Sequence, residues 1–267
     1  MLFRSTIISS ERPDTTAEAL LNGKVVIVVD NSPFVLIMPG LLSDCFIDAE
    51  DRYNKGINVT FTRIVKYLAF HISLLTPAFY IAITTYNQEM IPTLLIINFA
   101  AQRNNIPFPA FFEALIMILS FEILRESDLR IPNFTSSALS IVGALILGEA
   151  AVNAGLVSPI MIIVVALTSI AALSFSEQEI INGLRWYRLF FMIAASFMGM
   201  YGLVLAFCVY LIKMASLKSF GKPYLMPFIP TYIEGLKNSI VKFPEKMIKK
   251  RVSYLSDNRV KMGDMND

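Results

Sequence analysis

The stretch LFFMIAASFMGMYGLVLAFCVYLI, residues 189–212, decides the fold class of this chain. These 24 residues contain no charged side chain, and a helix of that length crosses about 30 Å of hydrocarbon. Arg185, Trp186 and Arg188 precede the stretch and Lys213 follows it, as is typical of a span held at both membrane interfaces. The pattern predicts a membrane-spanning helix.

Two other stretches resemble this one. Residues 67–86 hold His71 as their only ionisable side chain of note, and a tyrosine stands at each edge. They predict the first span, with a kink and not a break at Pro77 because a neighbouring helix can satisfy the freed carbonyl. Residues 107–124 open with prolines, which suit a helix start, and predict a second helix.

Residues 135–173 contain a single charge, Glu149, and are too long for one span. The run NAGLVSP at 153–159 predicts a turn between two helices there. The apolar run MIPTLLIINFAA at 90–101 is too short to cross the bilayer and is interpreted as re-entrant or interfacial. Basic residues precede the first span and follow the last. Because basic residues favour the cytoplasmic side, we expect both ends on that side, which requires an even number of membrane crossings.

The beginning of the chain has a different pattern. KVVIVVD at 24–30 and PFVLIMP at 33–39 are short β-rich runs around a turn, which predicts a β-hairpin. The expected fold is therefore mainly α: a polytopic membrane bundle of about five helices, plus the re-entrant or interfacial segment and a short N-terminal β-hairpin.

Charge and composition suggest three regions. Only 16% of the residues are charged, well below the value of about 25% for soluble domains. From Leu211 to Met262 there are eleven Lys or Arg against three acidic residues, a bias typical of the cytoplasmic, lipid-facing side. We expect residues 1–62 to be the remnant of a soluble domain, 63–215 to be embedded in the membrane, and 216–267 to form a basic cytoplasmic tail.

The same residues argue against several function classes. The chain has no glycine-rich phosphate loop, no nucleophile elbow and no Cys/His metal spacing, and its single histidine excludes a multi-histidine zinc site. We therefore expect no catalytic residues, no metal site and no cofactor. The basic tail suits membrane lipids, and we expect no nucleic-acid partner because no basic face on a folded soluble domain is evident.

Carboxylates within apolar stretches indicate functional positions more clearly than the other motifs do, because a charge inside a membrane normally faces water or a partner. Glu113, Glu122 and Glu149 are the candidates for an ion pathway or its gate. Glu113 could instead anchor a helix start, and Glu122 could form a simple ion pair with Arg125 three residues later. Glu149 has no basic residue within one helical turn. We therefore expect it to hold a functional position, where it either faces water or packs against another helix.

Small residues recur at four-residue spacing, which lets helix backbones approach closely. We interpret them as helix-packing positions that could also line a narrow pore in a symmetric assembly. The pairs are Ala144 and Gly148, Ala151 and Gly155, and Ala195 and Gly199.

Five runs together resemble the GerA family of spore germination proteins, specifically the A subunit. They cover most of residues 10–230, in order, and are more specific than any single motif. The runs are ERPDTTAEALLNGKVVIVVDNSPFVLIMP (11–39), YNQEMIPTLLI (86–96), IPFPAFFEALIMILSFEILRESDLRIP (106–132), SIVGALILGEAAVNAGLVSPIMIIVVALTSIA (140–171) and FGKPYLMPFIP (220–230).

The resemblance implies an integral protein of the spore inner membrane that works with a transporter-like B subunit and a lipoprotein C subunit. It also implies that the A subunit forms homo-oligomers and an ion path opened by nutrient binding. Two departures stand out: the large soluble domain expected before ERPD is missing from this chain, and Glu149 stands where the resemblance leads us to expect Gln. The run SFSEQEIINGLRW is also shorter than the family linker we expect.

Two alternatives stay open. A secondary transporter or permease needs broken helices around a midplane site, and Pro77 or the turn at 153–159 could supply the breaks, although no internal repeat is visible. A vestigial scaffold subunit that conducts nothing is the second alternative, motivated by the missing soluble domain.

Overall fold

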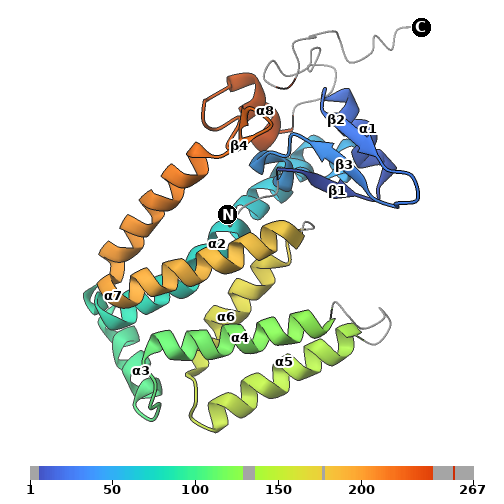
Figure 1. The fold of residues 1–267 in the computed structure, drawn as a ribbon. Helices are drawn as coiled ribbons and strands as arrows, with labels where there is room; N and C mark the ends of the chain where they lie inside the picture. Colours follow the sequence, from blue (N-terminus) through green and yellow to red (C-terminus); the bar gives the residue numbers. More distant parts are fainter. Residues whose placement is uncertain (1–5, 129–135, 176–177, 243–254, 256–267) are drawn as a thin grey trace, which may run out of the picture. The chain divides into compact units, whose positions relative to one another are not determined.

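The computed structural model describes residues 6–128, 136–175, 178–242 and 255 (Figure 1). The chain divides into two compact units. Unit 1 combines Met1–Ala69, Phe175–Gly183 and Val209–Asp267, and unit 2 combines Phe70–Ser174 and Leu184–Cys208. The beginning and the end of the chain thus belong to one unit. The three-part division expected from composition stays a prediction.

Unit 1 contains a three-stranded antiparallel sheet of order β1-β3-β2. The predicted hairpin is confirmed: β2 (Val25–Val28) pairs with β3 (Val35–Met38), and Asn31 in the connecting turn adopts φ +61°, a conformation that Asn tolerates. A third strand, β1 (Ile8–Ser10), pairs with the other edge of β3. Between β1 and β2 the chain forms helix α1 (Pro13–Leu21), which starts on a proline as its first-turn geometry allows.

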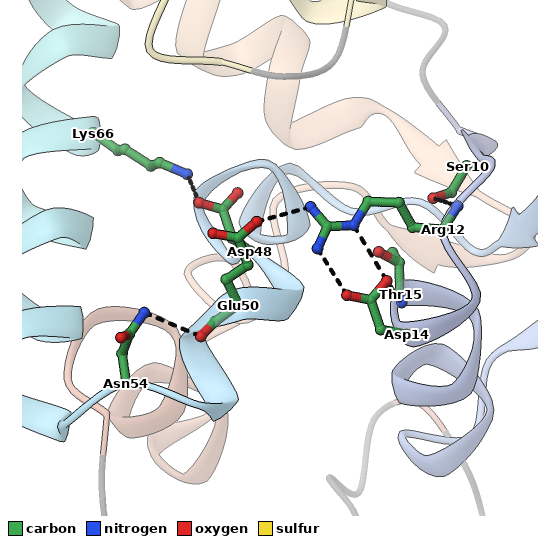
Figure 2. A network of polar contacts seen from close by, with 8 residues as sticks. All are labelled: Ser10, Arg12, Asp14, Thr15, Asp48, Glu50, Asn54 and Lys66. Carbon is green, nitrogen blue, oxygen red and sulfur yellow. Dashed lines mark hydrogen bonds and ion pairs between the residues drawn. The ribbon is translucent and has the colours of Figure 1, made fainter.

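Charged residues join the ERPD run to the segment that follows the sheet (Figure 2). Arg12 donates to Asp14 through two nitrogens, at 3.2 and 2.8 Å, and to Glu50 at 3.0 Å. These hydrogen bonds hold the pKa of Asp14 below its ordinary value. Glu50 belongs to a 3-10 turn, η2 (Ala49–Arg52), and the neighbouring Asp48 pairs with Lys66 of the next helix.

The C-terminal segment completes unit 1. It forms a small hairpin of β4 (Lys218–Ser219) and β5 (Lys222–Pro223), followed by helix α8 (Ile233–Ile240). The amide of Leu42 donates to the carbonyl of Tyr224 at 3.0 Å, so the run after β5 packs onto the 3-10 turn η1 (Leu42–Phe46). Aromatic rings contribute further contacts within this unit, namely those of Phe46, Tyr67, Phe175 and Phe228. The tail beyond residue 242 lies outside the described residues except for Leu255.

Unit 2 is built from helices. Each of the predicted helical stretches at 67–86, 107–124, 135–173 and 189–212 contains helix, and α4 packs against both α5 and α6. The run 90–101, interpreted as re-entrant or interfacial, lies mostly in helix α3; whether it is re-entrant or interfacial stays a prediction. The helices are α2 (Gly56–Thr85, which begins in unit 1), α3 (Thr93–Arg103), α4 (Ala110–Asp128), α5 (Ser136–Asn153), α6 (Pro159–Ala172) and α7 (Gln178–Ser216, whose first and last parts belong to unit 1), with a 3-10 turn η3 (Gln88–Met90) before α3.

Prolines and glycines act differently along the two longest helices. α2 continues through Pro77, as predicted. The stretch 189–212 predicted one continuous helix, but α7 bends at Gly199, whose φ of +60° and ψ of −140° are not helical. The side-chain oxygen of Asn87 accepts a hydrogen bond from the amide of Met200 at 3.0 Å and so caps the second half of α7. This partner lies in a distant part of the sequence, which is why the local pattern did not indicate the break.

Two helices among the described residues are long and apolar enough to cross a membrane, Gly56–Thr85 and Ile180–Ser216. α6 has 14 residues, fewer than the roughly 20 that a straight span needs. The chain is therefore mainly helical with two candidate spans and a small N-terminal sheet. The polytopic bundle, in which further helices cross, stays a prediction.

Candidate functional site

The three candidate carboxylates lie on two neighbouring helices of unit 2. Glu113 and Glu122 are both on α4, nine residues or about 13 Å of helix rise apart, and Glu149 is on α5. Nine residues turn the helix by about 180°, so the two α4 carboxylates point to opposite faces. The structure gives each of the three a different environment.

Glu113 is fully buried and fully paired, with no exposed surface. One carboxylate oxygen accepts hydrogen bonds from the backbone amide of Ser158 at 3.1 Å and from its hydroxyl at 3.0 Å. The other oxygen accepts from the guanidinium of Arg103 at 3.2 Å. A single side chain therefore connects the end of α3, the start of α4 and the start of α6.

Local sequence explains why these groups meet at helix ends. Glu113 stands in the first turn of α4, where the helix dipole favours a carboxylate, and Arg103 stands in the last turn of α3, where it favours a cation. Ser158 is the N-cap of α6, with its hydroxyl accepting from the amide of Met161 at 3.3 Å and Pro159 following it. The interpretation of Glu113 as a helix-start anchor matches this geometry.

Glu122 is ion-paired and partly buried. The predicted pair with Arg125 is present, and Arg185 of α7 reaches the same carboxylate oxygen at 2.5 Å. Arg188, one turn after Arg185, is 6% exposed and donates from Nε to the carbonyl of Ser73 at 2.8 Å. The sequence pattern alone places Arg185 and Arg188 only at the flank of the last span.

Glu149 differs from both. Its side chain is exposed on α5, beside the exposed Ile146 and Leu147. Within the described ranges it makes no hydrogen bond and no ion pair, whereas Glu113 and Glu122 are each held by cationic partners. Glu149 is thus the candidate whose carboxylate is available to an ion, to water or to a partner.

The candidate small residues serve several purposes. Gly148 is buried against Ile162 of α6, and a Cβ there would stand 3.7 Å from that side chain, an ordinary contact. Gly155 adopts φ +66° in the turn between α5 and α6, and Gly199 forms the break in α7. The others show no common surface: Ala195 is buried, and Ala144 and Ala151 are partly exposed. Pore lining by these residues stays a prediction.

The arrangement holds charged side chains in place. In the part of the chain that the structure describes, no three His, Cys, Asp or Glu residues gather as metal ligands. Sequence reasoning missed Arg103 and Ser158 as partners of Glu113. The Ser158–Pro159 pair signals a helix start, but nothing local signals which carboxylate faces it.

Comparisons with known proteins add independent findings. The model of a family described as Bacillus/Clostridium GerA spore germination protein matches residues 2–254. The chain is 45% identical over 259 residues to spore germination protein KA of Bacillus subtilis, covering 97% of this chain and 48% of that protein. It is 38% identical over 248 residues to spore germination protein GerLA of Bacillus cereus, covering 93% and 50%.

A third relative is named as a membrane protein. The uncharacterized membrane protein YfkQ of Bacillus subtilis is 39% identical over 235 residues, covering 88% of this chain and 46% of that protein. The chain thus spans about half the length of these curated relatives. No solved structure matches it.

Proposed function

Because the chain belongs to the GerA family of spore germination proteins, we propose that it is an A-type subunit of a nutrient germinant receptor in the spore inner membrane. The observation that carries the proposal is the family match over residues 2–254, nearly the whole chain. The two long apolar helices, and the similarity to a relative that is named as a membrane protein, support insertion in a membrane. No enzyme chemistry is part of the proposal.

The subunit contributes to a nutrient-gated ion pathway, and the geometry favours α4, α5 and α6 as its region. Glu149 is the best candidate for a pathway-lining carboxylate, because it is exposed and has no ion-pair partner among the described residues. Glu113 is better suited to position the starts of α4 and α6, since its oxygens are already occupied. The proposed assembly comprises further copies of this chain together with B-type and C-type subunits.

The decisive experiment uses spores. Germination and potassium release are measured in spores that lack this chain, and again after it is restored, across a panel of amino acids and sugars. Loss and recovery of one nutrient response would support the receptor-subunit proposal. If the response to every nutrient in the panel stays unchanged, the receptor-subunit proposal is overturned. The vestigial scaffold is then favoured, in which family membership reflects ancestry and fold only.

A matched pair of variants tests the pathway separately. Glu149→Leu removes the exposed carboxylate and Glu149→Gln keeps its size and polarity, and both are compared in restored spores. We expect slower potassium release with Leu than with Gln. Unchanged conductance and germination with Leu would remove Glu149 from the pathway while leaving the receptor role intact.

One observation favours a second candidate function. A secondary transporter needs a broken helix, and α7 supplies one at Gly199, with the new helix start capped by Asn87. Purified protein in sealed vesicles distinguishes the two functions. Saturable uptake of a labelled nutrient would favour transport, and ion flux without uptake would favour the pathway.

A further inference from the structure

Unit 2 contains a cavity with an unusual set of walls. It has a volume of about 160 Å³ and lies among α4, α5, α6 and α7. Most of its wall is apolar, and the charged side chains that line it are Glu122, Arg125 and Arg188. Arg185 reaches the cavity's carboxylate at 2.5 Å. The apolar lining comes from Ile118, Phe121, Leu124, Ala144, Ala172 and Leu173.

Positive charge is in excess around this cavity. Among the described residues, the guanidinium groups of Arg125 and Arg185 pair with the carboxylate of Glu122, and that of Arg188 lines the same cavity. Glu126, exposed one turn further along α4, adds a second carboxylate nearby, and the cations still outnumber the anions. An uncompensated cation in a partly buried site is unfavourable, so the site favours an added anion.

Donor groups without acceptors are available at the same place. Arg188 is more than nine-tenths buried, and beyond its bond from Nε to Ser73 it makes no hydrogen bond or ion pair within the described residues. The Nε atoms of Arg125 and Arg185 are buried and have no hydrogen-bond partner among those residues. Buried donors of this kind are normally satisfied by a partner that completes the site.

We propose that the cavity lined by Arg125 and Arg188 binds a phosphate group, either inorganic phosphate or the headgroup of an anionic phospholipid. The planar guanidinium fork matches phosphate oxygens in a bidentate manner, which lysine does not. The cavity volume of about 160 Å³ leaves room for the five heavy atoms of a phosphate group. The apolar wall suits the acyl region next to a lipid headgroup. The assignment is independent of the proposed germination function.

The test uses the full chain, purified and stripped of lipid in detergent. Thermal unfolding midpoints are measured with inorganic phosphate against chloride at equal ionic strength. In a second arm they are measured in nanodiscs of phosphatidylglycerol against phosphatidylcholine, without free phosphate. Stabilisation in the first arm alone identifies free phosphate as the ligand, and stabilisation in the second identifies the lipid headgroup.

Variants assign the effect to the cavity. Arg125→Gln leaves the pair of Glu122 with Arg185 in place, and Arg188→Lys keeps the charge but loses the fork. Each should weaken binding of the stabilising phosphate compound by about tenfold to a hundredfold, the worth of a charged hydrogen bond. Lys213→Gln, at an exposed position outside the cavity, removes one positive charge as the control and should leave binding unchanged.

Circular dichroism of each variant confirms that it is folded before binding is compared. No difference between phosphate and chloride, together with no difference between the two lipids, would overturn the proposal. An equal loss of binding in Lys213→Gln would do the same, because the effect would then follow net charge and not the cavity.

Discussion

At the scale of single residues, one helix carries two carboxylates with opposite roles. Glu113 is buried with three hydrogen bonds, while Glu122 is shared by two arginines beside a cavity. Their residue type is the same, and only their neighbours distinguish them. The exposed Glu149 forms a third case without a partner in the described part of the chain.

Glu113→Gln should destabilise unit 2. The change leaves the partly buried guanidinium of Arg103 without its counter-charge and weakens hydrogen bonds that a carboxylate accepts strongly, which costs about 1.5–3 kcal/mol. Denaturant titration in detergent micelles measures the loss. Glu149→Gln, the same substitution at an exposed site, is the control and should stay within about 0.5 kcal/mol of the parent chain. Equal losses in both variants would contradict the anchoring role of Glu113.

Arg12→Gln should change how the stability of unit 1 depends on pH in the acid range. The pKa of Asp14 is lowered in the folded chain by the hydrogen bonds from Arg12, so this contribution is present above about pH 4 and is lost as pH falls through the lowered pKa. The variant should therefore unfold at a lower temperature than the parent chain at pH 7. This difference in unfolding temperature between the variant and the parent chain should disappear in strong acid.

Thermal unfolding followed across pH checks this prediction, and a repeat in high salt serves as its control. Both side chains are at the surface, so salt should narrow the gap at pH 7 by screening the pair. A gap that persisted unchanged into strong acid would show that Arg12 acts through packing and not through Asp14.

At the scale of elements, the break in α7 depends on a glycine and on a distant cap. Gly199 has φ +60°, and an added Cβ would stand 2.7 Å from Cβ of Tyr86 and 2.8 Å from the side-chain oxygen of Asn87. Both values are too short for real contacts. The bend is therefore compatible with glycine and with few other residues.

Gly199→Ala should destabilise the fold by about 1–3 kcal/mol, which is the cost of one strained backbone position. The loss of stability should be larger if Tyr86 cannot move away from the added Cβ. Gly148→Ala is the matched control, because its Cβ would make only an ordinary contact with Ile162 inside a regular helix. That control should be neutral or stabilised by up to about 1 kcal/mol. Unfolding titrations of the two variants test the difference, and a neutral Gly199→Ala would mean that α7 can straighten.

At the scale of the whole molecule, the two ends of the chain form one compact unit. The carbonyl of Thr6 accepts from the amide of Gly40 at 2.8 Å and from the hydroxyl of Ser219 at 3.0 Å, joining the segment before β1 to the C-terminal hairpin. We therefore expect β1 and the hairpin of β4 and β5 to lie on the same side of any membrane that the chain crosses. This agrees with the even number of crossings expected from the flanking basic residues.

Cysteine labelling tests this topology. Asp30→Cys and Lys218→Cys are exposed positions of unit 1, and each is introduced singly after Cys45 and Cys208 are replaced by serine. A membrane-impermeant maleimide added to sealed vesicles should label both positions from the same side. Labelling of the two positions from opposite sides would separate the ends of the chain and contradict the shared unit.

The helices could be predicted from the sequence because their signals are local. Apolar runs, prolines at helix starts and the NAGLVSP turn lie within each element, so the bounds of α4, α5 and α6 were close to those expected. Strand β1 and helix α1 were not predicted, because a three-residue strand has little pattern of its own and forms by pairing with β3. The candidate carboxylates were found together with one partner, Arg125 of Glu122, but the partners from other helices, Arg103, Ser158 and Arg185, were not.

The sequence by itself determined the helical class, the N-terminal hairpin, the candidate carboxylates and the family, since apolarity, periodicity and matching runs are written along the chain. Only the tertiary structure decided that Glu113 meets Ser158, 45 residues away, and that Asn87 caps α7 at Met200, 113 residues away. The same holds for the gathering of three arginines around one cavity. Such contacts depend on which helices pack together, and that choice is made by the fold as a whole and not by any local run of residues.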